Sequence, residues 1–273
     1  GSEPSAVRAR LSALVDTPLV AVVGTRSPSP YGEEMARGIA GDLTRAGVVV
    51  VSGMALGVDS VAQTAAVDAA AGTVPSTVAV LGCGADVVYP RRNARLYARI
   101  TCGGLVLSEF AWGVPARAWR FPARNRIMAA LVRGVVFVEG THRSGGRITV
   151  THAADIGRDV LCVPGEAGRR LSEAPNGLLR QGAKVCEGAG DVLAAIGVRG
   201  AGEGGAPPFV APDHGGAAVR DVLAALREAS LTIDELARRC GLPVAKAAAA
   251  VSDLEIEGLT RRVDGGRYLL LRR

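Results

Sequence analysis

The eight residues from Trp119 to Arg126 carry the strongest chemical signal in the sequence. They hold two aromatic rings, three Arg and one Asn, although aromatic residues make up only 4% of the chain. Aromatic rings stack on nucleic-acid bases at about 1–3 kcal/mol each, and guanidinium groups hold the phosphates between them. The segment therefore predicts contact with single-stranded nucleic acid. Phe121, just before a helix expected over 125–132, is predicted to face the ligand, whereas Trp119 fits ligand contact and core packing equally well.

Positive charge is concentrated around this segment. The whole chain has 32 basic and 26 acidic residues, a net charge of +6, and nearly all the basic residues are Arg. Residues 91–147 contain eleven Arg against Glu109 and Glu139, a net charge of +9, so the rest of residues 1–196 is net negative. A GC-rich coding bias would enrich Arg but would spread it evenly along the chain. The concentration therefore predicts a folded basic patch that meets phosphates.

Small residues recur where the predicted strands end. The turns that begin at Gly24, Ser52, Gly82 and Gly140 are rich in Gly and Ser. Small residues at the start of a helix let backbone N–H groups approach an anion, which the helix dipole also favours. One such turn is usually no more than a tight turn, but four turns at one sheet edge predict a phosphate cradle. The residues expected to form this cradle are Gly24, Arg26, Ser52, Gly53, Ser144, Gly145, Gly146 and Arg147.

Motifs of nucleotide-processing sites are missing from these turns. Gly24-Thr25-Arg26 breaks the G-x-G-x-x-G pattern at once, and the turn at Gly82 lacks its third Gly. Neither a Walker A loop nor a G-x-S-x-G elbow is present, and no His stands beside a Ser in these loops. The five Cys and three His lack the spacing of metal ligands or of a disulfide framework. We therefore predict a protein that holds phosphates without cutting them, with no metal, no cofactor and no enzymatic activity.

Short Val-rich runs alternate with helical stretches through residues 1–196. Most of these runs are apolar on both faces, which is typical of parallel strands covered by helices on two sides. The strands are expected at 19–23, 48–51, 77–81, 105–107, 135–138 and 160–163. Helices are expected between them, for example at 31–46 and 58–71. The pattern predicts an α/β fold, an extended Rossmann-like doubly wound and mostly parallel sheet that binds ligands beyond the carboxyl ends of its strands.

A second, smaller domain is expected at the carboxyl end of the chain. Residues 197–216 are rich in Gly, Pro and Ala and predict a flexible linker between a domain at 1–196 and one at 217–273. Three helical stretches followed by a hairpin with a Gly-rich turn predict a winged helix, and Thr232 with Glu235 fits a capping box. The wing could read DNA. The third helix carries three acidic residues against one Lys, which suits a major groove poorly, so a protein-interaction module is the alternative.

No apolar run approaches the roughly 18–20 residues needed to cross a bilayer, and the chain does not open like a signal peptide. We therefore predict a cytoplasmic protein without a membrane partner. Gly1-Ser2 resembles an expression remnant, so the natural N-terminus is expected to differ.

Six short motifs, in consistent order, resemble the DNA-processing protein A (DprA, also called Smf) family. Residues 24–32 are similar to G-x-R-x-x-S-x-Y-G, and 52–59 to S-G-x-A-x-G-I-D. Residues 81–93 resemble L-G-x-G followed by Y-P-x-x-N, and 108–127 resemble S-E followed by F-P-x-R-N-R-I. Residues 144–165 are similar to S-G-S-L-I-T, G-R and V-P-G in series. Any one motif is weak, but six in order are highly specific.

The resemblance covers about residues 18–196 and implies a single-stranded DNA-binding domain that dimerises. It also implies that the protein protects incoming single-stranded DNA and loads the RecA recombinase in natural transformation. The DNA pocket implied by position consists of Arg26, Ser52, Gly53, Phe121, Arg124, Asn125, Arg126, Ser144 and Gly145. Substituting Arg26 or Arg124 by Ala is then expected to weaken binding without unfolding the protein. The chain departs from the family pattern at Gln63, where the family has His, and at Gly146-Arg147, where it has Ser-Leu.

Two rival functions are considered. A Rossmann-type nucleotide-processing enzyme, related to the lysine-decarboxylase-like phosphoribohydrolases, could use Glu109 or Glu139, but its P-G-G-x-G-T-x-x-E motif is missing. A winged-helix transcription regulator with a ligand-sensing body is disfavoured by the acidic third helix. We expect Glu139 to orient Arg residues or to cap the site.

Overall fold

The computed structural model describes residues 4–70, 75–198, 217–256 and 259–271. The chain divides into two compact units, residues 1–203 and 204–273, called here the body and the tail unit. The linker expected at 197–216 lies almost wholly outside the described residues, so its flexibility stays a prediction.

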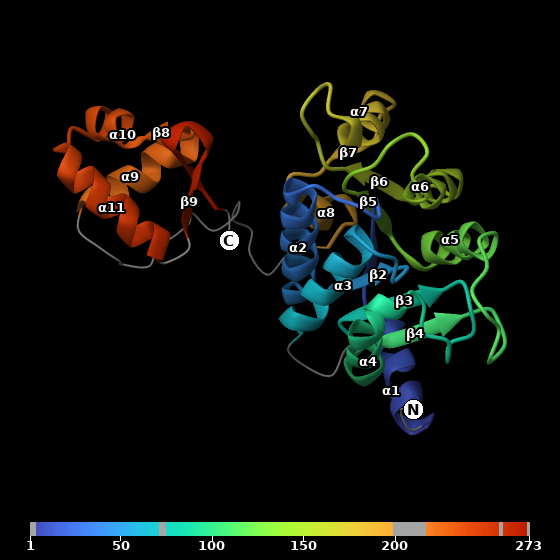
Figure 1. The fold of residues 1–273 in the computed structure, drawn as a ribbon. Coiled ribbons are helices and arrows are strands. Elements are labelled where there is room, and N and C mark those ends of the chain that lie inside the picture. Colours follow the sequence, from blue (N-terminus) through green and yellow to red (C-terminus); the bar gives the residue numbers. More distant parts are fainter. Residues whose placement is uncertain (1–3, 71–74, 199–216, 257–258, 272–273) are drawn as a thin grey trace. The chain divides into compact units, whose positions relative to one another are not determined.

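In the described part of the body, seven parallel strands form one sheet (Figure 1). The strands are β1 (Leu19–Val23), β2 (Val49–Ser52), β3 (Thr77–Leu81), β4 (Leu105–Ser108), β5 (Gly134–Phe137), β6 (Asp159–Cys162) and β7 (Lys184–Val185). Their order is β4-β3-β2-β1-β5-β6-β7. The chain therefore adds β2, β3 and β4 on one side of β1, and then adds β5, β6 and β7 on its other side. This order confirms the predicted doubly wound α/β sheet. The sequence pattern does not predict β7, which is two residues long and exposed.

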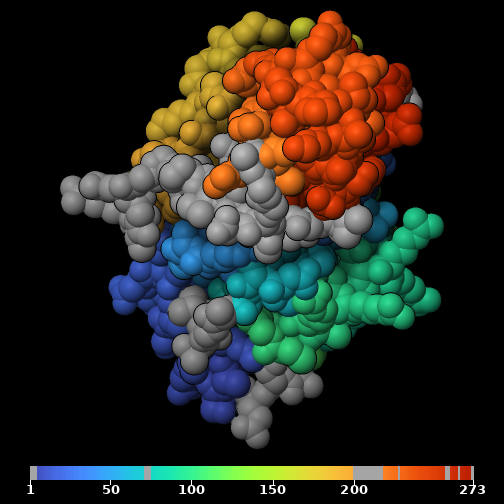
Figure 2. Space-filling view, turned by 90° about the vertical axis from the view of Figure 1, so that its left-hand side faces the viewer, coloured from blue at the N-terminus to red at the C-terminus, as the bar shows by residue number. Residues whose placement is uncertain are grey.

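Helices cover both faces of this sheet. α2 (Pro30–Arg45), α3 (Val58–Ala69) and α8 (Ala189–Ala195) pack on one face, and α1 (Pro4–Leu14), α5 (Arg120–Leu131), α6 (Gly146–Asp155) and α7 (Glu173–Arg180) pack on the other. α4 (Ala94–Gly103) packs against β3. Figure 2 shows α2 (blue) and α3 (cyan) side by side on their face of the body.

The central strand explains why the Val-rich runs become buried strands. Val20 and Val22 of β1 point to the α2–α3 side, while Ala21 and Val23 point to the α5–α6 side, and all four are almost fully buried. Burying one such Val side chain stabilises the fold by roughly 1.5–3 kcal/mol. A strand that is apolar on both faces is therefore held rigidly, and its carboxyl end is fixed in place.

Helix boundaries differ from the sequence expectation in one place that matters for function. α5 begins at Arg120, five residues before the predicted start, so Phe121 lies in the first turn of the helix instead of before it. Pro122 fits there because the first turn of a helix does not need its backbone N–H. The prediction that this helix begins at residue 125, with Phe121 before it, is therefore wrong.

The tail unit has the predicted winged-helix architecture. α9 (Ala217–Glu228), α10 (Ile233–Cys240) and α11 (Val244–Ile256) pack around an apolar core, and the antiparallel sheet has the order β8-β10-β9. The strands are β8 (Leu231–Thr232), β9 (Thr260–Val263) and β10 (Arg267–Leu270).

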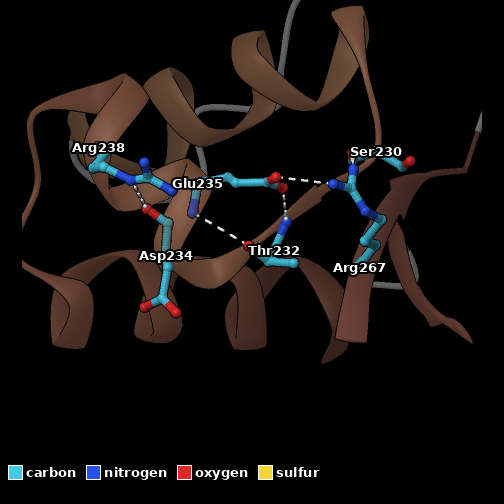
Figure 3. Close-up of polar contacts among 6 residues, drawn as sticks. All are labelled: Ser230, Thr232, Asp234, Glu235, Arg238 and Arg267. Carbon is cyan, nitrogen blue, oxygen red and sulfur yellow. Dashed lines mark hydrogen bonds and ion pairs between the residues drawn. The ribbon is translucent and has the colours of Figure 1, made fainter. Parts of the chain in front are cut away.

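The capping box predicted for the tail unit is present at the start of α10 (Figure 3). Thr232 Oγ1 accepts from the Glu235 backbone N–H at 3.3 Å, and the Glu235 carboxylate accepts from the Thr232 N–H at 2.8 Å. Arg267 on β10 donates to the same carboxylate at 2.8 Å and to the Ser230 carbonyl at 2.6 Å. The Arg267 side chain therefore connects β10 of the wing to the start of α10.

The five Cys are all free thiols. Cys162 and Cys186 are fully buried, and burial raises the pKa of each to about 12. A thiolate is the reactive form of Cys, so these two residues act as small apolar core side chains.

Candidate nucleic-acid interface

A cleft of about 570 Å³ lies at the carboxyl ends of the central strands of the body. Its walls come from the loops after β1 and β5, from α5 and α6, and from the segment before α5. β1 pairs with β2 on one side and with β5 on the other, so the sheet changes its direction of growth here. Open α/β sheets bind ligands in the crevice at such a switch point.

Eight of the twelve predicted site residues line this cleft. They are Gly24, Arg26, Phe121, Arg124, Asn125, Ser144, Gly145 and Gly146. They come from parts of the chain more than a hundred residues apart, and the parallel sheet brings them together.

The other four predicted residues do not line the cleft. Ser52 is fully buried, and its hydroxyl donates to the Val22 carbonyl at 2.7 Å, so it joins β2 to β1 behind the cleft wall. Gly53 lies against the Arg124 guanidinium, where a Cβ atom would clash. Direct ligand contact by Ser52 is therefore the wrong interpretation, because a side chain without exposed surface cannot reach a ligand.

Arg126 and Arg147 lie outside the cleft as well. Arg126 is about half exposed and forms an ion pair with Glu109. Arg147 donates to the carbonyl of His142 at 3.2 Å, within the loop that precedes α6. Both remain near the basic surface, but neither is placed to contact a ligand inside the cleft.

An aromatic pair and a guanidinium form one wall of the cleft. The rings of Tyr89 and Phe121 stack with centroids 5.4 Å apart and planes 29° apart. The Arg26 guanidinium carbon lies 5.8 Å from the Phe121 ring centre. Gly82 allows this arrangement, because a Cβ there would lie 3.0 Å from the Phe121 ring. The wall therefore offers π-faces beside a positive charge, the pairing that bases and phosphates require.

Sequence reasoning missed several residues of the cleft. They are Thr25, Asp59, Tyr89, Arg117, Arg143 and Thr149, among others. Arg117 and Arg143 belong to the predicted basic block, and Tyr89 belongs to a motif quoted above, so a signal for these three was available. Asp59 closes the motif quoted at 52–59, so a signal was available for it too, although an acidic residue does not suit a phosphate site on composition alone.

Arg124 and Asp59 are two buried charged side chains in the wall of the cleft. They are only 5% and 7% exposed. Burial lowers the pKa of Arg124 and raises the pKa of Asp59, and the charge of each opposes the effect on the other. Asp59 accepts from the backbone N–H groups of Gly53 (3.1 Å) and Ala55 (3.4 Å), and Arg124 donates to the Val80 carbonyl. Asp59 therefore holds the loop after β2 to α3, and Arg124 joins α5 to β3.

Neighbouring polar side chains hold the other loops of the cleft. Asn125 Nδ2 donates to the Gly145 carbonyl at 3.1 Å, which ties α5 to the start of α6. The Ser144 hydroxyl accepts from the Thr141 N–H at 2.9 Å. Gln63, fully buried, accepts from the Met54 N–H at 3.0 Å and donates to Thr77 at 3.1 Å. Gln63 is therefore a structural link between α3, β3 and the loop after β2.

Glu139 does not orient an Arg residue. Its carboxylate accepts from the backbone N–H of Ser29 at 2.8 Å and from the Ser29 hydroxyl at 2.6 Å. Gly32 leaves room for this carboxylate, which a Cβ would displace. Glu139 therefore ties the loop after β5 to the start of α2.

Within the described ranges, no group of three or more His, Cys, Asp or Glu could hold a metal ion. Among the helices of those same ranges, none combines the length and apolar character of a membrane span.

Comparisons with known proteins agree with this geometry. Residues 10–197 match the family described as DNA recombination-mediator protein A, and residues 206–266 match the DprA winged helix domain. The chain belongs to this family. The resemblance drawn from the six motifs is therefore confirmed.

Relatives within the DprA family show the extent of the similarity. Protein Smf of Escherichia coli (strain K12) is 37% identical over 259 residues, which cover 93% of this chain and 68% of that protein. The crystal structure of DNA processing protein A from Streptococcus pneumoniae matches with a TM-score of 0.60 and 40% identity, covering 66% of this chain and 62% of that chain. Both relatives are thus longer than the part that matches.

A structure of DNA processing protein A from Helicobacter pylori, described for its single-stranded DNA binding mode, also matches. Its TM-score is 0.60 at 31% identity, and the match covers 67% of this chain and 82% of that chain.

Proposed function

We propose that this DprA-family chain binds single-stranded DNA in the cleft of its body and acts as a non-enzymatic recombination mediator. The observation that carries the proposal is the cleft wall in which Phe121 stacks on Tyr89 beside Arg26. The single-stranded DNA binding described for the H. pylori relative supports it.

Different parts of the cleft contact the bases and the phosphates of a bound strand. Bases stack on the Tyr89–Phe121 pair, while Arg26, Arg117 and Arg143 attract the phosphates. The backbone at the start of α6, with Gly145 and Gly146, offers N–H groups to an anion. A duplex, whose bases are stacked on each other, cannot use the aromatic wall, so single strands are preferred.

The wider role is suggested by the family to which the chain belongs. We propose that the chain dimerises through its body, shields single-stranded DNA in the cytoplasm during natural transformation and passes it to the RecA recombinase. A RecA strand-exchange assay on single-stranded DNA with the full chain tests this role: stimulation is expected, and its absence despite DNA binding would remove RecA loading from the proposal.

The DNA-binding step is tested by fluorescence anisotropy with a labelled oligothymidylate and duplex competitor. Arg26→Ala is expected to weaken binding roughly tenfold or more, because it removes both a phosphate contact and the charge over Phe121. Arg37→Ala on α2 is the matched control, since it removes the same charge from an exposed position outside the cleft.

Two outcomes would contradict the proposal. Strong preference for the duplex would show that the aromatic wall is not used. Release of a base from a nucleoside monophosphate would favour the nucleotide-processing enzyme considered from the sequence.

A further inference from the structure

We propose that the loop between β4 and α5 carries a second base-stacking surface for single-stranded DNA, formed by Trp119 and Trp112. The inference rests on the proposed function, because it extends the DNA path out of the same cleft. The loop runs from the end of β4 at Ser108 to Arg120, where α5 begins (Figure 1).

Both Trp side chains of the protein lie in this loop, and both face solvent. Trp119 is 62% exposed and Trp112 is 80% exposed. Trp has a large apolar surface and is highly buried on average in folded proteins. Two exposed Trp side chains within eight residues, beside a cleft, therefore indicate a binding surface.

Trp112 is exposed on a fixed turn. It follows Ala111, whose carbonyl accepts from the Val114 N–H at 3.2 Å, and precedes Gly113, which has a φ of +76°. The Gly113 N–H donates to both carboxylate oxygens of Asp86 at 2.9 Å. The backbone is thus anchored on both sides of the Trp, which leaves the ring presented to solvent.

Trp119 is held by an aromatic and cationic cluster. The Arg120 guanidinium lies 4.9 Å from the Phe110 ring centre and 5.1 Å from that of Trp119. The Phe110 and Trp119 rings meet edge to face, with centroids 6.3 Å apart. Arg120 also donates to the Pro115 carbonyl. The ring is therefore positioned by its neighbours while most of its surface remains free for a base.

The position of Trp119 places this surface at the rim of the cleft. Ala116, Arg117 and Ala118 line the cleft, and so does Phe121 two residues further on. A strand that stacks on Phe121 and continues over this rim meets Trp119 next, with Trp112 further along the same loop.

The charges around the loop favour a nucleic acid over an apolar protein partner. Arg117 and Arg120 are positive, while the two nearby acidic groups are already engaged: Glu109 pairs with Arg126, and Asp86 accepts the Gly113 N–H. Aromatic rings interleaved with guanidinium groups are the composition of a single-strand platform.

The two Trp residues make the proposal directly measurable. Trp112→Phe and Trp119→Phe each leave one Trp in the full chain, so the fluorescence of each variant reports one position. An oligothymidylate of about 20 nucleotides is expected to quench both signals, because stacked bases quench indole emission. One of about 6 nucleotides, confined to the cleft, is expected to leave Trp112 nearly unchanged.

Affinity gives a second readout. Trp119→Ala is expected to weaken binding of the longer oligothymidylate roughly tenfold and of the shorter one much less, while Trp119→Phe stays within about twofold of the original chain. Ile156→Ala is the matched control, because it removes an exposed apolar side chain at the far end of α6.

The outcomes separate this inference from the proposed function. Binding of the longer strand with unquenched Trp and unchanged affinity of Trp119→Ala would overturn the second surface and leave the cleft intact. Emission that changes with protein concentration but not with DNA would overturn it in favour of contact between two copies. Failure of the original chain to bind any single strand would overturn the proposed function itself.

Discussion

Arg124 is the residue whose role the structure changes most. From the sequence it is one of three Arg in a DNA-binding segment, and its replacement by Ala is expected to leave the fold intact. In the structure it is buried, donates to the Val80 carbonyl and to Asn125 at 3.2 Å, and its charge opposes the effect of burial on the pKa of Asp59. Its main contribution is therefore to hold the cleft together.

Arg124→Ala is expected to lower the free energy of unfolding by about 3 kcal/mol, because it leaves the Val80 carbonyl without its side-chain donor and the buried Asp59 carboxyl without the opposite charge of Arg124. Arg26→Ala, at an exposed position, is expected to change it by no more than about 0.5 kcal/mol. Urea denaturation of both variants measures the difference. Equal, small effects would contradict the structural role of Arg124.

The loss of unfolding free energy in Arg124→Ala is also expected to depend on pH. Burial raises the pKa of Asp59 above its unfolded value and the Arg124 charge lowers it, so removing Arg124 raises that pKa further. A carboxyl group whose pKa is higher in the folded than in the unfolded state stabilises the fold at low pH. This contribution to the free energy of unfolding is lost as pH rises through the folded pKa. The deficit should therefore grow as pH rises through the folded pKa of Asp59 and then level off.

At the scale of elements, a single carboxylate in each unit connects neighbouring segments of the fold. Glu139 joins the loop after β5 to α2 in the body, and Glu235 joins α10 to the wing through Arg267 in the tail unit. Each is a carboxylate that accepts a backbone N–H at the start of a helix.

Acid is expected to weaken the start of α10. The N–H of Thr232, with a smaller effect of Arg267, holds the pKa of Glu235 below its usual range. A lowered folded pKa contributes stability above the unfolded value of about 4.3, and this stability is lost as pH falls through the folded pKa. Glu235→Gln should therefore be less stable than the original chain near neutral pH and equal to it in strong acid.

Thermal unfolding followed across this pH range, with Glu255→Gln on the exposed side of α11 as the control, measures this difference. A Glu235→Gln deficit that persists unchanged in strong acid would show that packing, and not the carboxylate charge, stabilises the start of α10.

Sequence reasoning succeeded where local patterns decide the outcome. The Val-rich runs predict six of the seven strands described in the body, and Thr232 with Glu235 predicts the capping box. It made no prediction for α1, α4, α7 and α8, although α4 and α7 are amphipathic. It also failed where tertiary contacts decide, because Ser52 looks like a ligand residue until the sheet buries it. The strand ends were predicted to converge, but which side chains would face the cleft depends on packing that no local pattern contains.

At the scale of the whole molecule, three Arg side chains reach the cleft from separate loops and remain exposed: Arg26, Arg117 and Arg143. Single-stranded DNA that meets three such charges releases counterions, so binding should weaken with salt with a logarithmic slope of roughly −2. Arg117→Ala or Arg143→Ala should each make the slope shallower by roughly 0.7. Anisotropy titrations at several salt concentrations measure this slope, and an unchanged slope in both variants would remove these residues from the DNA path.

The switch point at β1 has a consequence for folding. The cleft is built from both halves of the sheet, β1 to β4 on one side and β5 onward on the other, and neither half contains it alone. A ligand bound there stabilises only the chain in which both halves are assembled. An occupied cleft therefore couples the two halves into a single cooperative unit, so the body should resist partial opening most strongly while it carries a strand.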